Sequence, residues 1–331
     1  FDMWKTSQMS KALTGDFFQA QYNKLAVKDS ERGEKLKGVK AACIGCHSPS
    51  AYKAKDIPPT PTDDQKIDNF WNQKGGIKLY ADRGVFCDFC HTIEDFSGMT
   101  PVNHNYISHA GPGIEPKRGD LEFPWSPYHE TARSELHEDA QFCGICHNEL
   151  NDFGVWVKAT EIEYQDSPYQ AKYIACQDCH MPPVAGKPAK MGPARDENHD
   201  HWFGGGFTGF VEGAAKISLI IGQTELKIGG KTNFKVKVHH LAPGHKFPSG
   251  SSEERDVWLH VGIYDRAGNE LEHIKIPKNP DDPNDKYFIT SNEKVAYPSH
   301  SRHSKAIARD CLPEGDRIYH SAFIDSDGNF T

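Results

Sequence analysis

The sequence predicts two domains. The first, over residues 1–213, is expected to be mostly helix and loop with little regular secondary structure, and the second, over residues 214–331, a small antiparallel β-sandwich. Three observations predict this division: four copies of one cysteine motif lie before residue 181, glycine and proline interrupt the chain around them, and a two-residue apolar alternation begins after residue 213. A chain of 331 residues is long enough for about two domains that each bury a core.

Charge and hydropathy argue against nucleic-acid binding and against a transmembrane segment. The net charge is -8, and the 38 lysines and arginines are scattered along the chain, so nucleic acid is not an expected partner. The most apolar stretch of the middle region, residues 217–221, is far shorter than the roughly 20 residues of a membrane helix, so no transmembrane segment is expected. The sequence begins at Phe1 without a signal-like segment, and any export signal is expected to have been removed.

Eight of the nine cysteines fall into four C-x-x-C-H units, the attachment signature of c-type haem. Two thiols three residues apart can each add to one vinyl group of a single porphyrin, and the adjoining histidine then becomes the proximal ligand of the iron. The motifs therefore predict four covalently bound haem c groups and a multihaem cytochrome c fold for the first domain. The attachment cysteines are Cys43, Cys46, Cys87, Cys90, Cys143, Cys146, Cys176 and Cys179, and the proximal ligands are His47, His91, His147 and His180.

The alternative interpretation of the cysteines is two tetrahedral all-cysteine zinc sites, but zinc would not require a histidine after every pair. Haem attachment of this type takes place on the export side of the membrane. We therefore expect an extracellular or cell-surface protein, with the periplasm as the alternative. The ninth cysteine, Cys311, has no C-x-x-C neighbour, and we expect a buried small side chain rather than an intermolecular disulfide.

Porphyrins packed this densely displace an ordinary side-chain core, so the first domain is expected to consist of short helices and long loops. Helices are predicted over residues 3–13 and 16–27, where no breaker interrupts the pattern. Residues 57–62 and 111–119 are rich in proline or glycine and are predicted as loops. A linker is predicted from Met181 to Gly206.

Strand periodicity dominates the second domain. Turn signals at Gly229-Gly230 and at residues 266–269 separate segments in which apolar and polar residues alternate, and the absence of helices between them favours an antiparallel sandwich. Residues 325–329 are a further turn signal, with two residues after it, so either the native chain continues or the last strand pairs elsewhere. The predicted strands are residues 224–228, 233–239, 256–265, 270–276 and 317–324.

Each haem iron has a second axial position, and the fourteen histidines outside the motifs exceed the four that are needed. A histidine is a candidate where the following motif or a rigid loop would hold it near a porphyrin; otherwise it is expected to be solvated or hydrogen-bonded. A helix is expected to carry His129 and His137, which precede the third motif. Of His199 and His201, which follow the linker, one is expected to point inward. Glycine and proline fix the loop around His245. The candidates are His129, His137, His201 and His245, with His104 and His109 less favoured.

Several stretches together carry a resemblance. They are Phe142 to His147, Ser167-Pro168-Tyr169 before Cys176 to Pro182, His199 to Gly206, and Gly244 to Gly250 with Arg255 and Trp258. This set resembles the multihaem c-type cytochromes that include the tetrahaem carriers of ammonia oxidisers. It is most similar to extracellular tetrahaem cytochromes that polymerise into conductive filaments in metal-reducing bacteria and archaea. The resemblance implies low-spin haems with histidine on both faces, stacked in a near-continuous chain without a substrate pocket.

One departure from that family concerns the N-terminus. Many relatives carry a ligand histidine in a Trp-x-x-Ser-x-His helix, whereas here Trp4 and Ser7 are followed by Met9. A methionine on a helix face is more often a core residue than a ligand. That haem is therefore expected to take another histidine, from this chain or from a neighbouring molecule.

The sequence thus predicts an electron carrier without enzymatic activity, in which no residue is catalytic. We expect it to form a homopolymeric filament with haem contacts between subunits, and to exchange electrons with redox partner proteins or extracellular acceptors. The alternative is a multihaem oxidoreductase that acts on hydroxylamine, nitrite or a sulfur oxyanion at a haem with an open sixth position. Against the enzyme, no motif has its histidine replaced by lysine, as in cytochrome c nitrite reductases.

Overall fold

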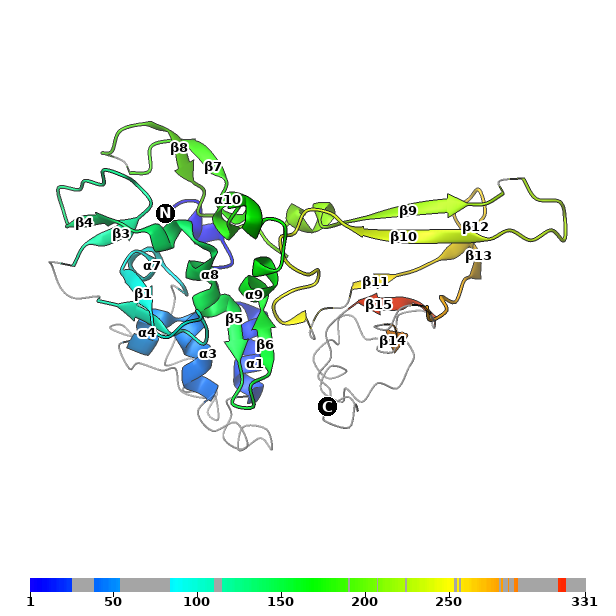
Figure 1. The fold of residues 1–331 in the computed structure, drawn as a ribbon, viewed down its shortest axis with the longest axis horizontal. Helices are drawn as coiled ribbons and strands as arrows, with labels where there is room; N and C mark the ends of the chain where they lie inside the picture. The colour runs from blue at the N-terminus through cyan, green and yellow to red at the C-terminus, as the bar shows by residue number, and fades with distance from the viewer. Residues whose placement is uncertain are drawn as a thin grey trace. The chain divides into compact units, whose positions relative to one another are not determined.

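The chain divides into two compact units, Phe1–Lys246 and Phe247–Thr331, shown in a computed structural model (Figure 1). The division falls later than the boundary predicted after residue 213. The predicted loop at 57–62, Cys311 and the turn signal at 325–329 lie outside the described residues. The structure describes residues 1–25, 39–53, 84–109, 115–189, 191–206, 208–223, 225–252, 255, 257–279, 281, 285, 289–290 and 315–319.

The helices of the first unit are short, as predicted for this domain. The helix expected over residues 3–13 is a single 3-10 turn, Trp4–Thr6, followed by further turns, whereas α1 begins at Asp16 as predicted. The α-helices of this unit are α1 (Asp16–Leu25), α3 (Val39–His47), α4 (Pro49–Lys53), α7 (Cys87–Cys90), α8 (Ala140–His147), α9 (Thr160–Gln165) and α10 (Cys176–His180). The 3-10 helices after η1 (Trp4–Thr6) are η2 (Glu135–Glu138), η3 (Gln170–Lys172) and η4 (Gly209–Gly213).

Two-stranded sheets connect these helices. Four of the pairs are antiparallel, and β3 with β4 is parallel. The helix expected around His129 is wrong, because that stretch holds β4 and only then the short η2. The strands are β1 (Ile93–Phe96), β2 (Tyr106–Ser108), β3 (Lys117–Gly119), β4 (Thr131–Arg133), β5 (Asn148–Leu150), β6 (Trp156–Ala159), β7 (Pro183–Gly186), β8 (Arg195–His199), β9 (Ala215–Ile221) and β10 (Phe234–His240).

The last pair of this unit, β9 with β10, forms the long hairpin in Figure 1. Its register joins Ile221 to Phe234 and Ala215 to His240. The strand predicted at 224–228 is wrong, whereas β10 matches the strand predicted at 233–239 to within one residue. The isoleucine-rich run before residue 222 is the better strand former, and Gly229, with a φ of +79°, lies in the connection between the two strands.

The cores of the first unit are built on the middle residues of the cysteine motifs. Ile44 is 0%, Phe89 6% and Ile145 1% exposed. Ile44 packs in a cluster with Leu13 and Tyr22, and the other two share a second cluster. Helix α8, which carries the third motif, contacts η2, α9, α10, β5 and β6 and therefore connects many elements of this unit.

The described part of the second unit contains short antiparallel strands. β11 (Val257–Leu259), β15 (Arg317–Tyr319) and β14 (Ile289–Thr290) form one sheet, with β15 in the middle, and β12 (Gly262–Tyr264) pairs with β13 (Glu270–His273). The strand predicted over 256–265 is thus two strands with different partners, whereas the turn at 266–269 is present, with a φ of +86° at Gly268. The β-sandwich itself stays a prediction.

Among the described residues, no helix is both long enough and apolar enough to cross a membrane.

The packing of Ile145 leads to a stability prediction. Ile145→Ala should lower the free energy of unfolding by about 2–5 kcal/mol, because it leaves a cavity in the cluster between the second and third motifs. Ile107→Ala is the matched control, since Ile107 is 36% exposed on β2 and should cost far less. Guanidinium unfolding followed by far-UV circular dichroism measures both, and equal losses would contradict this account of the core.

Candidate haem sites

Each of the four C-x-x-C-H motifs lies on one turn of helix. The first ends α3, the third ends α8, the fourth forms all of α10, and in the second α7 spans the two cysteines, with the histidine directly after it. Residues three and four apart share a helix face, so both thiols and the imidazole of each motif point the same way. This is the arrangement that a single porphyrin needs for two thioether bonds and one axial ligand.

Three of the proximal histidines are held by a backbone carbonyl. The Nδ1–H of His47 donates to the oxygen of Ala12 at 2.7 Å, and that of His91 to the oxygen of Arg118 at 2.5 Å. The Nδ1–H of His180 donates to the oxygen of Gly204. Such a bond fixes the tautomer and the ring orientation and leaves Nε2 for a metal.

Two of the predicted distal histidines lie opposite two of these rings. The ring centroids of His91 and His201 are 6.1 Å apart with an interplanar angle of 30°, and those of His180 and His245 are 6.3 Å apart at 17°. Two imidazoles on one iron hold their centroids about 6 Å apart, because each metal–nitrogen bond spans about 2 Å and each centroid lies about 1 Å further out. The residues present therefore fit an iron between each pair.

The same two histidines have the hydrogen bonds of a metal ligand. The Nδ1–H of His201 donates to the oxygen of His199, and that of His245 to the oxygen of Lys246, both at 2.8 Å. Burial lowers the pKa of both imidazoles, which favours the neutral form that coordinates a metal. Neither Nε2 has a hydrogen bond within the described residues.

The other two predicted distal ligands are placed differently. His137 lies 5.9 Å from His91, but both of its nitrogens are engaged: Nδ1 with the Ser134 hydroxyl at 2.9 Å and Nε2 with the Cys90 oxygen at 3.1 Å. His129 is exposed, and its Nδ1–H donates to the oxygen of Glu130. The structure does not bring His129 into a ring pair with another histidine among the described residues.

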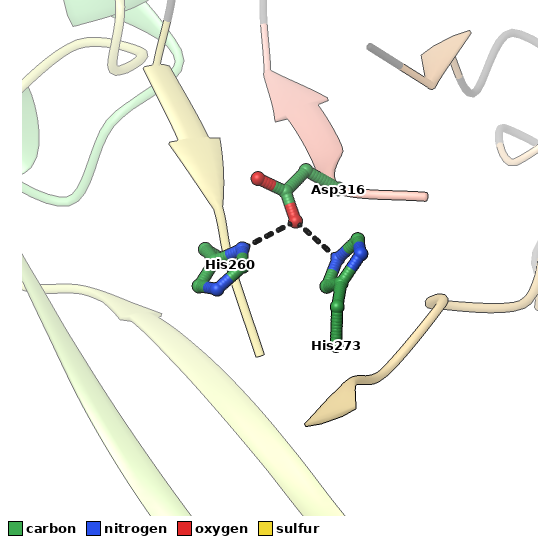
Figure 2. Close-up of side chains that lie close together, drawn as sticks. All are labelled: His260, His273 and Asp316. Atoms are coloured by element: carbon green, nitrogen blue, oxygen red, sulfur yellow. Dashed lines mark hydrogen bonds and ion pairs between the residues drawn. The ribbon is translucent and has the colours of Figure 1, made fainter. Parts of the chain in front are cut away.

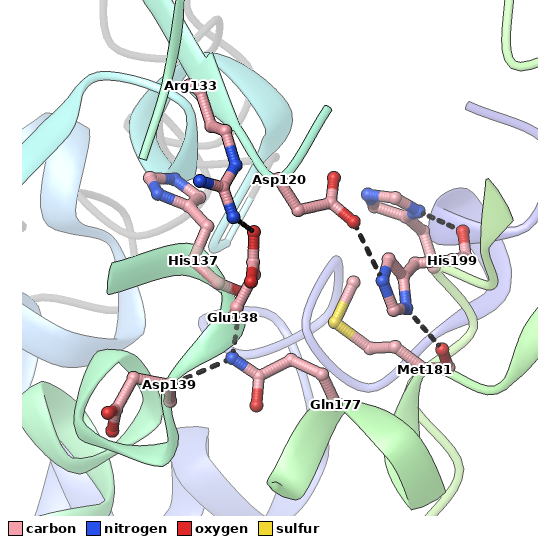
Figure 3. Close-up of polar contacts among 9 residues, drawn as sticks. Asp120, Arg133, His137, Glu138, Asp139, Gln177, Met181 and His199 are labelled. Atoms are coloured by element: carbon pink, nitrogen blue, oxygen red, sulfur yellow. Dashed lines mark hydrogen bonds and ion pairs between the residues drawn. The ribbon is translucent and has the colours of Figure 1, made fainter. Parts of the chain in front are cut away.

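His199, two residues before His201, is engaged by other residues. Its Nδ1–H donates to the oxygen of Met181 at 2.9 Å, and its Nε2 pairs with Asp120 at 2.8 Å (Figure 3). Figure 3 also shows Gln177, which follows Cys176 in the fourth motif and donates to the oxygens of His137 and Asp139, both at 2.9 Å. The fourth motif is thereby tied to the segment that leads into the third.

Sequence reasoning gave too little weight to His104. A Cβ added at Gly45, inside the first motif, would lie 2.4 Å from the His104 ring, and the backbone N–H of His104 donates to the oxygen of Ile145 in the third motif at 2.8 Å. The imidazole therefore lies between two motifs. The signal was a tight turn at Asn103-His104-Asn105, where Asn103 and His104 both have a φ of +51°.

The thiols of different motifs converge on the third motif. A hydrogen bond to Cys176 and burial raise the pKa of Cys143, and a hydrogen bond to Cys46 and burial raise that of Cys146. Both thiols also interact electrostatically with Cys90, whose own pKa is raised by burial to about 12. Each of the other motifs thus has a thiol near α8. The only candidate metal-ligand group among the described residues contains no cysteine.

His147, the proximal histidine of this third motif, has the least defined partner. Burial among protein atoms lowers its pKa to about 4, with further contributions from the charges of His180, Lys158 and His47. The residue is nevertheless exposed in the absence of a bound group. Among the described residues it has neither a carbonyl partner nor a paired imidazole ring.

Buried polar residues fix the chain directly after His147. Asn148 and Glu161 are 1% and 2% exposed, and the Asn148 amide donates to Glu161 at 2.9 Å and to the Pro101 oxygen at 3.0 Å. The backbone N–H of Glu161 donates back to the Asn148 side chain at 3.1 Å. This reciprocal pair joins the end of α8 to α9.

Comparison with protein families finds one model, described as cytochrome c552, that matches residues 4–198. The matched range covers more than half of the chain and contains all four motifs. Neither the curated proteins nor the solved structures yield a match.

The motifs predict the number of attached haems. The intact mass of the protein should exceed that of the polypeptide by four haem groups, because each motif offers two thiols on one helix face. Cys90→Ala should lower the count by one or leave the second haem on a single thioether. Mass spectrometry under denaturing conditions measures this, and the mass of the bare polypeptide plus zinc would contradict it.

The ring pair of His180 and His245 gives a sharper prediction. His245→Ala should convert one low-spin haem to high spin, because the imidazole opposite His180 is lost. His239→Ala is the matched control, since His239 lies exposed on β10. Electron paramagnetic resonance of the oxidised protein counts both populations. Four low-spin haems in the His245 variant would show that His245 is structural.

Proposed function

Because the chain belongs to the cytochrome c552 family, we propose that it is a multihaem oxidoreductase that reduces nitrite, or a closely related small oxyanion, at one open haem. It is a c-type cytochrome with covalently bound haem c that takes part in electron transfer. Proteins of this kind are typically exported. The observation that carries the proposal is the unpaired imidazole of His147 at the point where the motifs converge.

The expectation of an electron carrier without enzymatic activity is wrong. The family whose model matches residues 4–198 is known for nitrite reductase, a multihaem enzyme. The absence of lysine in place of a motif histidine and the surplus of histidines both favoured a carrier. Neither excludes an enzyme, because an open sixth position depends on which residues reach the distal side of the iron, whereas the motif supplies only the proximal side.

The histidines of the first unit support an open third haem. Every histidine up to Lys246 lies in the described part of the chain. His201 and His245 fit the second and fourth motifs, and His104 packs on Gly45 of the first. The remaining histidines are engaged elsewhere or exposed, as at His109, which pairs with Glu94. Among the described histidines of the first unit, none is then left as a distal ligand for the third motif, and a haem iron with an open position can bind a small ligand and transfer electrons to it.

The chain's own residues supply polar groups beside this motif. Lys158 is ion-paired with Glu149, and its charge contributes to the lowered pKa of both His47 and His147, so the ammonium lies within electrostatic range of this motif. The hydroxyl of Tyr106 is buried, has no hydrogen-bond partner among the described residues, and interacts electrostatically with Cys46 and Cys146. Burial raises the pKa of this phenol, so it stays protonated and can donate to an oxyanion.

Electrons would reach the third haem from its neighbours. Cys46, Cys90 and Cys176 come from the other three motifs, and each interacts with a thiol of the third. Haems attached at these thiols would have their edges close to the third porphyrin. The two motifs with paired imidazoles are suited to electron transfer, because a capped iron exchanges electrons without binding substrate.

Filament formation is a finer expectation that the family match does not support. The homopolymer with haem contacts between subunits stays a prediction from the resemblance, as does a ligand taken from a neighbouring molecule. Extracellular and periplasmic locations also stay open alternatives. Light scattering of the native protein measures the assembly state, and either result leaves the proposed enzymatic activity standing.

The open haem leads to a functional prediction. One haem per chain should bind cyanide in the oxidised protein, and the protein should consume nitrite with reduced methyl viologen as donor. Cyanide should inhibit this activity at the same stoichiometry. Tyr106→Phe should lower kcat while leaving cyanide binding unchanged, because it removes a hydrogen-bond donor and no iron ligand.

A matched control keeps this test specific. Tyr264→Phe removes a hydroxyl from the second unit and should leave nitrite consumption unchanged. Haems that all remain low-spin with cyanide, in a protein that does not consume nitrite, would overturn the proposed function.

A further inference from the structure

Three polar side chains meet in the second unit because of the register of its strands. The β11–β15 pairing ends with Leu259 opposite Arg317, so the next residues along, His260 and Asp316, continue opposite each other. In the adjacent hairpin Gly262 lies opposite His273, the last residue of β13. Figure 2 shows His260, His273 and Asp316 turned toward one another.

The carboxylate of Asp316 is the centre of this cluster. Its Oδ1 lies 2.8 Å from Nδ1 of His260 and 2.9 Å from Nε2 of His273, and the two rings stack with centroids 4.8 Å apart. Asp316 is 0% exposed, and its Oδ2 has no hydrogen-bond partner among the described residues. A fully buried carboxylate oxygen without a partner is costly, so the site calls for a cation.

A second carboxylate orients His260. The Nε2 of His260 lies 3.2 Å from Oε1 of Glu270 and 3.1 Å from the Tyr264 hydroxyl. The close approach depends on Gly262, because a Cβ there would lie 2.7 Å from Oε1 of Glu270. An imidazole whose Nε2–H donates to a carboxylate presents the lone pair of Nδ1 on its other side, as in carboxylate–histidine–metal triads.

We propose that His260, His273 and Asp316 bind a divalent transition-metal ion, best matched by zinc, at a site separate from the haems. Their ligand atoms all lie within 4.8 Å of one another. Two imidazole nitrogens and one carboxylate oxygen form a set that suits zinc, whereas calcium and magnesium prefer oxygen ligands. Three protein ligands leave the fourth tetrahedral position to water.

The distances from the two nitrogens to Asp316 need only a small adjustment. With metal–ligand bonds of about 2 Å, tetrahedral donor atoms lie roughly 3.3 Å apart. The two nitrogens would move outward from Oδ1 by about half an ångström, and the histidine side chains, 24% and 22% exposed, have room for this. The competing interpretation is a hydrogen-bonded trio in which both rings donate to Asp316 and no metal binds.

A bound ion would connect two parts of this unit. Asp316 and His260 lie at the end of the β11–β15 pairing, and His273 lies on the β12–β13 hairpin. The backbone already joins these parts through Ile274 N–H to the Val261 oxygen at 2.8 Å and Ile276 N–H to the Gly315 oxygen at 3.0 Å. The metal would therefore stabilise the unit in proportion to its binding.

The test uses the full haem-loaded protein and zinc ions. After treatment with a chelator and dialysis, calorimetric titration with ZnCl₂ should give one saturable site per chain, and zinc should raise the temperature at which the protein unfolds. Zinc is chosen because elemental analysis distinguishes it from haem iron. His273→Ala should weaken zinc binding at least tenfold, and Glu270→Gln should weaken it about 10- to 100-fold through the loss of the orienting carboxylate.

Glu272→Gln is the matched control, since it removes an exposed carboxylate from the same strand and should leave the affinity unchanged. If the His273→Ala variant does not fold, as judged by circular dichroism, the zinc affinity of the Glu270→Gln variant decides the test. The absence of saturable zinc binding, or equal affinity in the wild-type protein and in the Glu270 and His273 variants, would overturn the proposal and leave the hydrogen-bonded trio.

Discussion

The helical turn of the C-x-x-C-H motif is the constraint on which the first unit depends. Its spacing places two thiols and one imidazole on one side of the helix, and the same geometry turns a middle residue of the first three motifs to the other side. Ile44, Phe89 and Ile145 occupy these inward positions and are the centres of the buried clusters. A single short element therefore holds a prosthetic group on one face and a core on the other. This explains how a unit with short helices and two-stranded sheets can be compact, and why α8, which other motifs approach, is its centre.

The sequence predicted the parts of the site that are local. The four motifs are continuous in the chain, and their helical turns follow directly from spacing. The loops that present His201 and His245 were recognisable from the glycines, prolines and aromatic residues around them. The sequence favoured His129 over His104, although the positions of both depend on pairings between distant segments. Residues around His129 form a parallel pair with β3 where a helix was expected, and His104 is placed by a backbone bond to Ile145.

The difference between local features and features that depend on distant segments also applies to the strands and to the function. The run that forms β9 was recognised as apolar, but only its pairing with β10 identifies it as a strand. The cluster of His260, His273 and Asp316 could not be predicted from the sequence, since its members are separated by up to 56 residues and meet through strand register. The expected absence of enzymatic activity failed for a related reason. A motif shows the proximal side of an iron, whereas an enzyme is defined by the distal side, which distant residues either cap or leave open.

The number of histidines in the chain therefore does not determine which of them can bind an iron. The chain has more histidines than its irons need, yet those of the first unit are divided among carbonyl anchors, ion pairs and exposed strands. The measurement that tests this account most directly is an experimental structure of the haem-loaded protein at a resolution that shows the axial ligands. The account predicts His201 and His245 on the irons of the second and fourth motifs, and no side chain opposite His147 on the iron of the third. An imidazole bound to that third iron on both faces would contradict it.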